Sequence, residues 1–342
     1  MVNVGVIGCG YWGPNLIRNL SKLDGTKLRA LCDTEADRLQ QVARGYQVDY
    51  STQDASQIMS DSTVDAVVVT TPAATHYELA RQALLNGKSV LVEKPLALRV
   101  SEAEDLVALA DERGLVLMVG HTFLYNEAVN SLKECIQSGE LGNVYYLYSQ
   151  RLNLGRLRKD VNAMWNFAPH DISIVFHLLE EMPTTVSASG LCYIQPGIED
   201  VVFMQLSFPS GISAHIHISW LDPLKVRRMT VVGDKKMVVY DDVSTDAKLR
   251  LYDRGVVKMP TADSPRDFES FGAFQLLIRR GDVHIPALQF TEPLYNECQH
   301  FIDCVRENRR PLTDGLFGLK VVKVLAAADE SLRNNGHWMT VT

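Results

Sequence analysis

The sequence predicts an α/β protein in which a parallel sheet is followed by an α+β unit with a large, mostly antiparallel open sheet. Three observations support this prediction. A glycine-rich turn near the N-terminus links an apolar run to a helical stretch, apolar runs and helical stretches alternate as far as about His121, and longer strands with hairpin turns follow. The length of 342 residues suits two domains, which we place at 1–121 and 122–342.

In the first domain, valine-rich apolar runs are separated by segments with helical spacing of apolar residues. The predicted strands are residues 2–8, 27–32, 64–70, 89–92 and 115–120. The predicted helices are residues 14–23, 35–44, 75–86 and 101–113, and residues 46–60 suggest a short strand and then a helix. Strands that are apolar on both faces and flanked by helices indicate a parallel sheet covered on both sides.

The second domain is predicted to begin with a helix at 127–138 and to continue in strands of alternating polarity. Two hairpins are predicted, one from strands 201–208 and 211–220 around Pro209-Ser210, the other from strands 227–232 and 236–240. Further helices are predicted at 169–179, 292–308 and 316–335. Pro169 suits the first position of a helix, and the last two helices are expected to pack back on the sheet or on the first domain.

Composition restricts the class of partner. Hydrophobic residues make up 46% and charged residues 22%, which is ordinary for a soluble globular chain. The net charge of -7 argues against nucleic acid, although a local group of cations can still bind a small anion. No apolar run approaches membrane-spanning length and no basic leader precedes the first strand, so we expect no membrane association. The six cysteines form no C-x-x-C pair and are expected to be free thiols in a reducing cytoplasm.

The turn Gly8-Cys9-Gly10-Tyr11-Trp12-Gly13 and Asp33 form a dinucleotide-binding fingerprint in its required strand–turn–helix context, which predicts a Rossmann domain. Gly8 and Gly10 permit a tight turn and close approach of the backbone to a pyrophosphate, and Gly13 lets the helix pack on the strand. Asp33 is expected to accept a hydrogen bond from a ribose 2′-hydroxyl, so NAD is preferred over NADP, although Arg38 weakens that preference. A second interpretation has Asp33 capping the next helix.

Two residues are candidates for catalysis. Lys94, in Glu93-Lys94-Pro95, follows the carboxyl end of a predicted strand. In doubly wound sheets, ligands bind at the carboxyl ends of the strands. The Lys94 ammonium can stabilise an alkoxide, or Lys94 can be an ordinary solvated lysine. His170 is expected in the first helical turn, where the helix dipole disfavours imidazolium and favours a neutral base; a structural histidine is the alternative. Asn166, just before that helix, is a candidate for substrate binding or capping.

A group of cations precedes His170 and consists of Arg151, Arg156, Arg158 and Lys159. Such a group can bind a diphosphate through bidentate contacts, or it can form a solvated basic loop. Asp171 joins the predicted substrate-binding residues. His215 and His217 share one face of a strand without a third ligand at suitable spacing, so a polar sheet face is expected and no metal site is predicted.

These motifs resemble the Gfo/Idh/MocA oxidoreductase family over nearly the whole chain. The marks are the glycine turn, Thr71-Pro72 with His76, Glu93-Lys94-Pro95, Gly120-His121, Glu140-Leu141-Gly142 and the segment around His170. The resemblance implies an NAD(P)-binding Rossmann domain, with Thr71, Pro72, His76 and Glu93 at the cofactor, and a homodimer or homotetramer assembled through the open sheet. It also implies catalysis by a Lys and an Asp-x-x-x-His pair. Lys94 and His170 match, whereas Asn166 stands at the Asp position and cannot exchange protons.

Residues 149–155 and the segment Ala168-Pro169-His170-Asp171 resemble the nucleotide-sugar branch of that family. The expected activity is NAD-dependent hydride transfer at a ring carbon, C3 in that branch, of a sugar of the UDP-N-acetylglucosaminuronate type. Alternatives are a dTDP-sugar 3-ketoreductase and a cyclitol or free-sugar dehydrogenase. A regulator that binds dinucleotide and sugar without catalysis belongs to a different class, which intact Lys94 and His170 disfavour.

Overall fold

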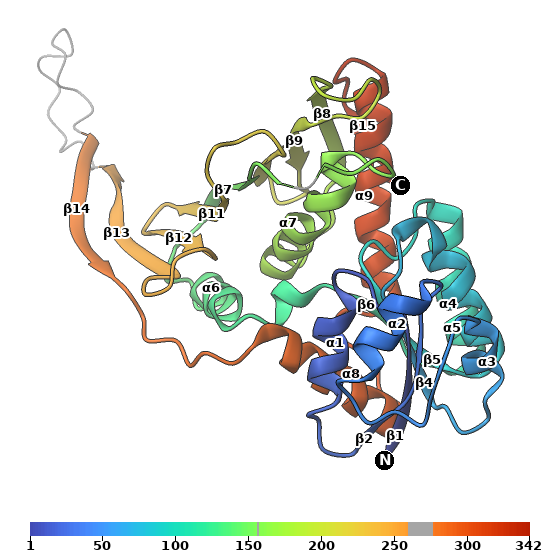
Figure 1. Ribbon diagram of the computed structural model, residues 1–342. Coiled ribbons are helices and arrows are strands. Elements are labelled where there is room, and N and C mark those ends of the chain that lie inside the picture. The colour runs from blue at the N-terminus through green and yellow to red at the C-terminus, as the bar shows by residue number, and fades with distance from the viewer. Residues whose placement is uncertain (156, 259–275) are drawn as a thin grey trace, which may run out of the picture.

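A computed structural model describes residues 1–155, 157–258 and 276–342 and shows two sheets joined by helices (Figure 1). Among the described residues, the first sheet has six parallel strands in the order β3-β2-β1-β4-β5-β6. They are β1 (Val2–Ile7), β2 (Thr26–Cys32), β3 (Tyr50–Thr52), β4 (Ala66–Val69), β5 (Ser89–Glu93) and β6 (Leu117–Gly120). The strand order reverses direction between β1 and β4, and in such sheets ligands bind at the carboxyl ends beside that reversal.

Helices cover both faces of the parallel sheet, as the apolar strands require. They are α1 (Gly13–Leu20), α2 (Ala36–Ala43), α3 (Ala55–Ser60), η1 (Ala73–Thr75), α4 (His76–Leu85) and α5 (Val100–Arg113). Val4 and Val6 pack with Ile17 of α1 in one apolar core, whereas Val67 and Val69 face Leu84 of α4 in a second. The alternation within each strand therefore divides the core between the two faces, and the predicted doubly wound arrangement is confirmed.

The second sheet is mixed but mostly antiparallel, in the order β14-β13-β12-β11-β7-β10-β9-β8-β15. Its strands are β7 (Val144–Leu152), β8 (Thr185–Leu191), β9 (Val201–Ser207), β10 (Ser213–Ser219), β11 (Val226–Gly233), β12 (Met237–Asp241), β13 (Leu249–Lys258), β14 (Leu276–His284) and β15 (Met339–Thr340). Both predicted hairpins, β9–β10 and β11–β12, are confirmed, and β7 pairs with β10 in parallel. β13 and β14 extend away from the rest of the chain (Figure 1).

One face of this sheet is covered by helices and the other is open. The covering helices are α6 (Glu127–Gln137), α7 (Ala163–Leu179) and α9 (Gly315–Arg333), which contact β12, β10 and β8 respectively. In β9, Val202, Met204 and Leu206 are buried under them, whereas Phe203 and Gln205 on the opposite face are exposed. The period of two in the sequence thus corresponds to one covered and one open face.

The last two helices return to the first domain. α8 (Pro293–Glu307) packs beside α1, where Arg18 pairs with Glu292 at 2.5 Å, and α9 contacts α5 as well as β8 (Figure 1). The expectation that these helices pack back on the sheet or on the first domain is confirmed. The 3₁₀-helix η2 (Thr122–Tyr125) leads from β6 into α6 and lies against α8. None of the described helices combines the length and apolarity needed to cross a membrane.

The predicted start of the helix that contains His170 was wrong. α7 begins at Ala163, where the side chain of Asn162 accepts a hydrogen bond from the backbone N–H of Trp165 at 3.0 Å. Pro169 lies inside the helix, and His170 is in its middle. A proline removes one backbone hydrogen bond, but the buried residues around it, Trp165 and Ile172 among them, hold the helix together by packing.

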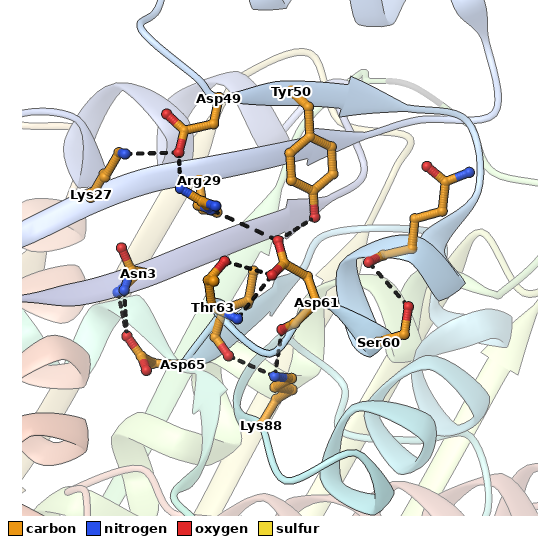
Figure 2. Close-up of polar contacts among 12 residues, drawn as sticks. Asn3, Lys27, Arg29, Asp49, Tyr50, Ser60, Asp61, Thr63, Asp65 and Lys88 are labelled. Atoms are coloured by element: carbon orange, nitrogen blue, oxygen red, sulfur yellow. Dashed lines mark hydrogen bonds and ion pairs between the residues drawn. The ribbon is translucent and has the colours of Figure 1, made fainter.

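A polar network joins the segments at the amino ends of β2, β3 and β4 (Figure 2). The glycine turn follows the carboxyl end of β1, so the network lies at the opposite ends of the strands. Asp49 accepts hydrogen bonds from Lys27 and Arg29, and Asp61 accepts one from Tyr50 at 3.0 Å. Lys88, which is 6% exposed, donates to the backbone carbonyls of Asp61 and Val64, both at 2.7 Å. The Lys88 ammonium therefore supplies the donor for the Val64 carbonyl and a second donor for the Asp61 carbonyl, which also accepts the backbone N–H of Val64 at 3.1 Å.

We expect Lys88→Met to lower the free energy of unfolding by about 2 kcal/mol, because it leaves the Val64 carbonyl without its donor and removes one of the two donors to the Asp61 carbonyl. Lys27→Met is the matched control: its side chain is 43% exposed and Asp49 keeps Arg29, so the loss should be below about 1 kcal/mol. The measurement is urea-induced unfolding followed by circular dichroism. Equal losses in the two variants would contradict a special role of Lys88.

Candidate active site

The residues singled out in the first domain all lie at the carboxyl ends of its strands. Gly8–Gly13 follow β1, Asp33 follows β2, Thr71 and Pro72 follow β4, and Glu93 and Lys94 are at the end of β5. The parallel sheet therefore gathers segments that lie as far apart along the chain as Gly8 and Lys94.

The glycine turn has the shape of a cradle for a pyrophosphate. Gly8 has φ +105°, which other residues rarely adopt, and a Cβ on Gly13 would lie 2.1 Å from the carbonyl oxygen of Gly8. A Cβ on Gly10 would meet no atom within 4 Å, so this position is free on the side a ligand can approach. Tyr11 is 86% exposed beside it, and the side chain of Trp12 acts to lower the pKa of Glu93. These features fit a dinucleotide, whose phosphates the backbone N–H groups of the turn would hold.

Asp33, which follows β2, is hydrogen-bonded to the backbone of the glycine turn. Its carboxylate accepts hydrogen bonds from the backbone N–H of Cys9 at 2.7 Å and of Glu35 at 2.9 Å, and Arg38 lies 3.5 Å away. Asp33 is 7% exposed. The residue at the N-cap of α2 is Glu35, so Asp33 closes the turn before the helix and is not itself the cap. A carboxylate and a guanidinium thus lie side by side where the ribose of a dinucleotide is expected.

His76 connects the loops that follow β4 and β5. It is buried, with Nδ1 2.7 Å from the carbonyl oxygen of Pro95 and Nε2 2.9 Å from that of Thr71. Burial lowers the pKa of His76, while the two carbonyls oppose that shift. A neutral imidazole donates to only one of them. Either way, the ring lies between the two loops and sets their spacing.

Lys94 links the two domains at the site. Its ammonium donates to the backbone carbonyl of Asn166 in α7 at 2.8 Å. Burial lowers the pKa of Lys94 to about 8, and the carboxylate of Glu93 opposes this shift while Arg151, Arg158 and Arg227 add to it. Burial also raises the pKa of Glu93 to about 7. This is an amine whose charge can change near neutral pH.

His170 lies one helical turn beyond the carbonyl that Lys94 contacts. Burial lowers the pKa of His170 well below its usual value, and Lys94, Arg151 and Arg227 lower it further. The imidazole ring of His170 packs edge-on against the ring of Phe123, with the ring centroids 5.0 Å apart. Within the described residues, Nδ1 of His170 has no hydrogen-bond partner. His170 is therefore neutral, as expected, but the reason is burial among cations and not a helix N-terminus. The two candidate catalytic groups converge from β5 and α7.

The predicted substrate residues have different surroundings. Asn166 is half-buried, and its backbone oxygen is the atom that receives Lys94. The carboxylate of Asp171 is buried against Arg151 at 2.6 Å. Arg158 pairs with Asp160 at 2.6 Å and is partly exposed, whereas Arg156 lies outside the described residues.

The interpretation of Arg151 as part of a basic loop was wrong, because this residue is buried in β7. The charge of Arg151 is balanced by Asp171, which allows it to leave water. In the part of the chain that the structure describes, no group of three or more His, Cys, Asp or Glu side chains is arranged to hold a metal ion.

Sequence reasoning missed two residues around the site, Glu297 and Arg227, and gave a third, His121, only as a mark of the family. Glu297 of α8 is fully buried and accepts a hydrogen bond from Thr122 at 2.7 Å. Burial and the charge of Glu93 raise the pKa of Glu297 well above its usual value. His121 is buried with both ring nitrogens unpaired among the described residues, and Arg227 lies on β11. The signal for Glu297 was a carboxylate on the same helical face as Leu294 and Phe301; for Arg227 no sequence signal was evident.

Comparison with known proteins identifies the class. Residues 2–121 match the model of an oxidoreductase family with an NAD-binding Rossmann fold, and residues 129–239 match the Gfo/Idh/MocA C-terminal domain. The chain belongs to the Gfo/Idh/MocA oxidoreductase family, and it is an oxidoreductase that acts on CH–OH groups.

Individual relatives differ in their activities. The chain is 30% identical to a 2,7-anhydro-N-acetylneuraminate hydratase of Escherichia coli, over 73% of this chain and 70% of the relative. It is 27% identical to a UDP-N-acetylglucosamine 3-dehydrogenase of Acidithiobacillus ferrooxidans, over 96% and 95%. A crystal structure from Magnetospirillum magnetotacticum, assigned to the oxidoreductases, has a TM-score of 0.79 at 32% identity and covers 95% of this chain and 99% of its own.

Gly10→Ala tests the cradle without disturbing the fold. Because the added Cβ has no neighbour within 4 Å, we expect thermal stability close to that of the unaltered protein. Binding of NAD, measured by isothermal titration calorimetry, should weaken at least about tenfold, because the methyl group occupies the space of the phosphates. Gly13→Ala is the contrast, since its Cβ overlaps the Gly8 carbonyl and should destabilise the domain. Unchanged NAD affinity in Gly10→Ala would show that the dinucleotide binds elsewhere.

Proposed function

We propose that this protein is an NAD-dependent oxidoreductase that moves a hydride to or from a ring carbon of a sugar. The substrate we favour is nucleotide-linked, of the UDP-N-acetylglucosaminuronate type, with reaction at C3. The observation that supports this most directly is the 2.8 Å hydrogen bond from Lys94 to Asn166, which brings the ammonium into the turn of α7 that ends at His170. The relative that acts on UDP-N-acetylglucosamine supports the substrate class.

In the direction of oxidation, the alcohol loses a hydride and a proton and becomes a ketone. Bound NAD would supply the hydride acceptor. His170, neutral at physiological pH, takes the hydroxyl proton, and Lys94 stabilises the developing negative charge on the oxygen. Asn166 contributes an amide that can hydrogen-bond a substrate hydroxyl but cannot exchange a proton. The roles reverse for reduction of a ketone.

For the cofactor, the gathered residues favour NAD. Asp33 offers a carboxylate to the ribose hydroxyls, and a 2′-phosphate would face that charge. Arg38, at 3.5 Å from Asp33, reduces the discrimination, and we therefore expect NADP to be accepted more weakly but not excluded.

We also propose that the open face of the second sheet pairs with another copy of the chain, giving a homodimer or homotetramer. On this face, the exposed ring of Phe203 stacks on His217 with the ring centroids 4.4 Å apart. The exposed ring of Tyr146 likewise stacks on Tyr148, so the face carries ordered aromatic side chains.

The activity is tested by mixing the purified protein with NAD or NADP and a panel of UDP-sugars, dTDP-sugars and cyclitols, and following the absorbance of reduced nicotinamide. With the substrate found, Lys94→Ala should lower kcat by about 10²–10³-fold, because the oxyanion loses its cation. Lys22→Ala, an exposed lysine of the same domain, is the control and should leave kcat unchanged. Full activity of Lys94→Ala would refute its role. Tight sugar binding without any change in absorbance would favour the non-catalytic sensor.

The pH profile reports on the same amine. A group needed in its charged form supports activity below its pKa and loses it above, so kcat/KM for oxidation should fall above about pH 8. Lys94→Arg should displace this limb to higher pH, because guanidinium stays protonated. Glu93→Gln should displace it to lower pH, because the attraction that raises the pKa of Lys94 is lost. If neither substitution moved the pH at which kcat/KM falls, the assignment of that limb to Lys94 would be contradicted.

A further inference from the structure

Two arginines face each other directly on the second sheet. β7 and β11 are antiparallel, and their register places Arg227 opposite Arg151. Directly opposed residues project from the same face with Cβ atoms about 5 Å apart, and like charges in this arrangement destabilise a sheet. The pair is therefore a feature that packing alone does not favour.

The face in question is the one covered by α7. Along β7 and β11, the residues that alternate in step with the two arginines, Leu147 and Val231 among them, are buried. The guanidinium of Arg151 lies 4.6 Å over the ring of Phe123, and that ring meets His170 at 5.0 Å. A path of contacts thus leads from Arg151, the residue opposite Arg227, through Phe123 to His170.

The two arginines differ in how their charge is balanced. Arg151 is 4% exposed and is held by both oxygens of Asp171. The side chain of Arg227 is 37% exposed and makes a single 3.4 Å contact with Asp242 among the described residues. That carboxylate is shared, because the Tyr240 hydroxyl and Lys248 also approach it, at 3.2 and 3.9 Å. Most N–H donors of the Arg227 guanidinium therefore have no protein acceptor among the described residues and are accessible to solvent.

The same charges act on the catalytic residues. Both Arg151 and Arg227 contribute to lowering the pKa of Lys94 and of His170. In a protein of net charge -7, this concentration of cations works against the charged ammonium on which the proposed reaction relies. An anion bound among the arginines would offset it.

We propose that Arg227, opposite Arg151, binds a carboxylate carried by the reacting sugar ring and thereby selects sugar acids over neutral sugars. This inference rests on the proposed function and assigns a specificity residue to it. A guanidinium fork matches a carboxylate through two parallel hydrogen bonds, a geometry that lysine does not reproduce. Arg227 lies opposite Arg151, whose guanidinium packs on the Phe123 ring that contacts His170. The anion it binds therefore belongs to the sugar ring near the reacting carbon, whereas a diphosphate would extend away from it.

The test compares two ligands that differ at one carbon: UDP-N-acetylglucosaminuronate, with a carboxylate, and UDP-N-acetylglucosamine, with a neutral hydroxymethyl group. Binding to the NAD-loaded protein is measured by calorimetry, and turnover is measured separately. The unaltered protein should bind the acid at least about tenfold more tightly. Arg227→Gln should weaken binding of the acid about 10–100-fold and leave the neutral sugar nearly unaffected, and Arg227→Lys should restore it only in part.

Arg228→Gln is the matched control. Arg228 is the next residue on β11, lies on the open face and pairs with Asp241 at 3.1 Å, so neither ligand should bind differently. Equal weakening of both ligands by Arg227→Gln would mean that it binds the shared nucleotide, and this result would overturn the inference. Equal binding of both ligands, or of neither, by the unaltered protein would also overturn it. Selective binding of the acid without hydride transfer would instead overturn only the proposed function.

Discussion

The site depends on keeping one ammonium charged at a place where burial opposes the charge. Lys94 retains its proton near neutral pH because Glu93 lies beside it and the carbonyl of Asn166 accepts its hydrogen bond. Burial and the neighbouring arginines favour the neutral amine. Such a balance requires that β5 and α7 keep their separation closely, since small changes in distance alter every contribution. Much of the surrounding structure can be understood as holding these two elements in place.

Several buried polar contacts perform that task. His76 lies between the loops after β4 and β5, and Thr70 donates to the carbonyl of Gly8 at 2.8 Å, which joins β4 to the glycine turn. On the other side, the buried pair of Arg151 and Asp171 ties α7 to β7. Removing one partner from a buried ion pair leaves an uncompensated charge and costs about 3–5 kcal/mol. The polar groups of the site thus have a structural function as well as a chemical one.

The first domain was more predictable than the second for a physical reason. Parallel strands buried on both faces are continuous apolar runs, and Gly8, Gly13 and Asp33 are constrained by backbone geometry that few other residues satisfy. The convergence of Lys94 and His170 was inferred through a family resemblance, since no spacing along the chain reveals it. The helix start near Pro169 was misjudged because packing outweighed a local preference. Arg227 and Glu297 depend on register and on long-range packing, which a single sequence does not show.

The return of the C-terminal segment to the first domain has a consequence for biosynthesis. Thr313 hydrogen-bonds both backbone groups of Val119 in β6, each at 2.8 Å, and α8 supplies Leu294 and Phe301 to the core beneath β1. When only the first 290 residues have left the ribosome, the core of the nucleotide-binding domain therefore still lacks the side chains that α8 contributes. We expect that domain to mature only after residues 293–313 have left the ribosome, so that termination before them would yield a fragment recognised by chaperones or proteases.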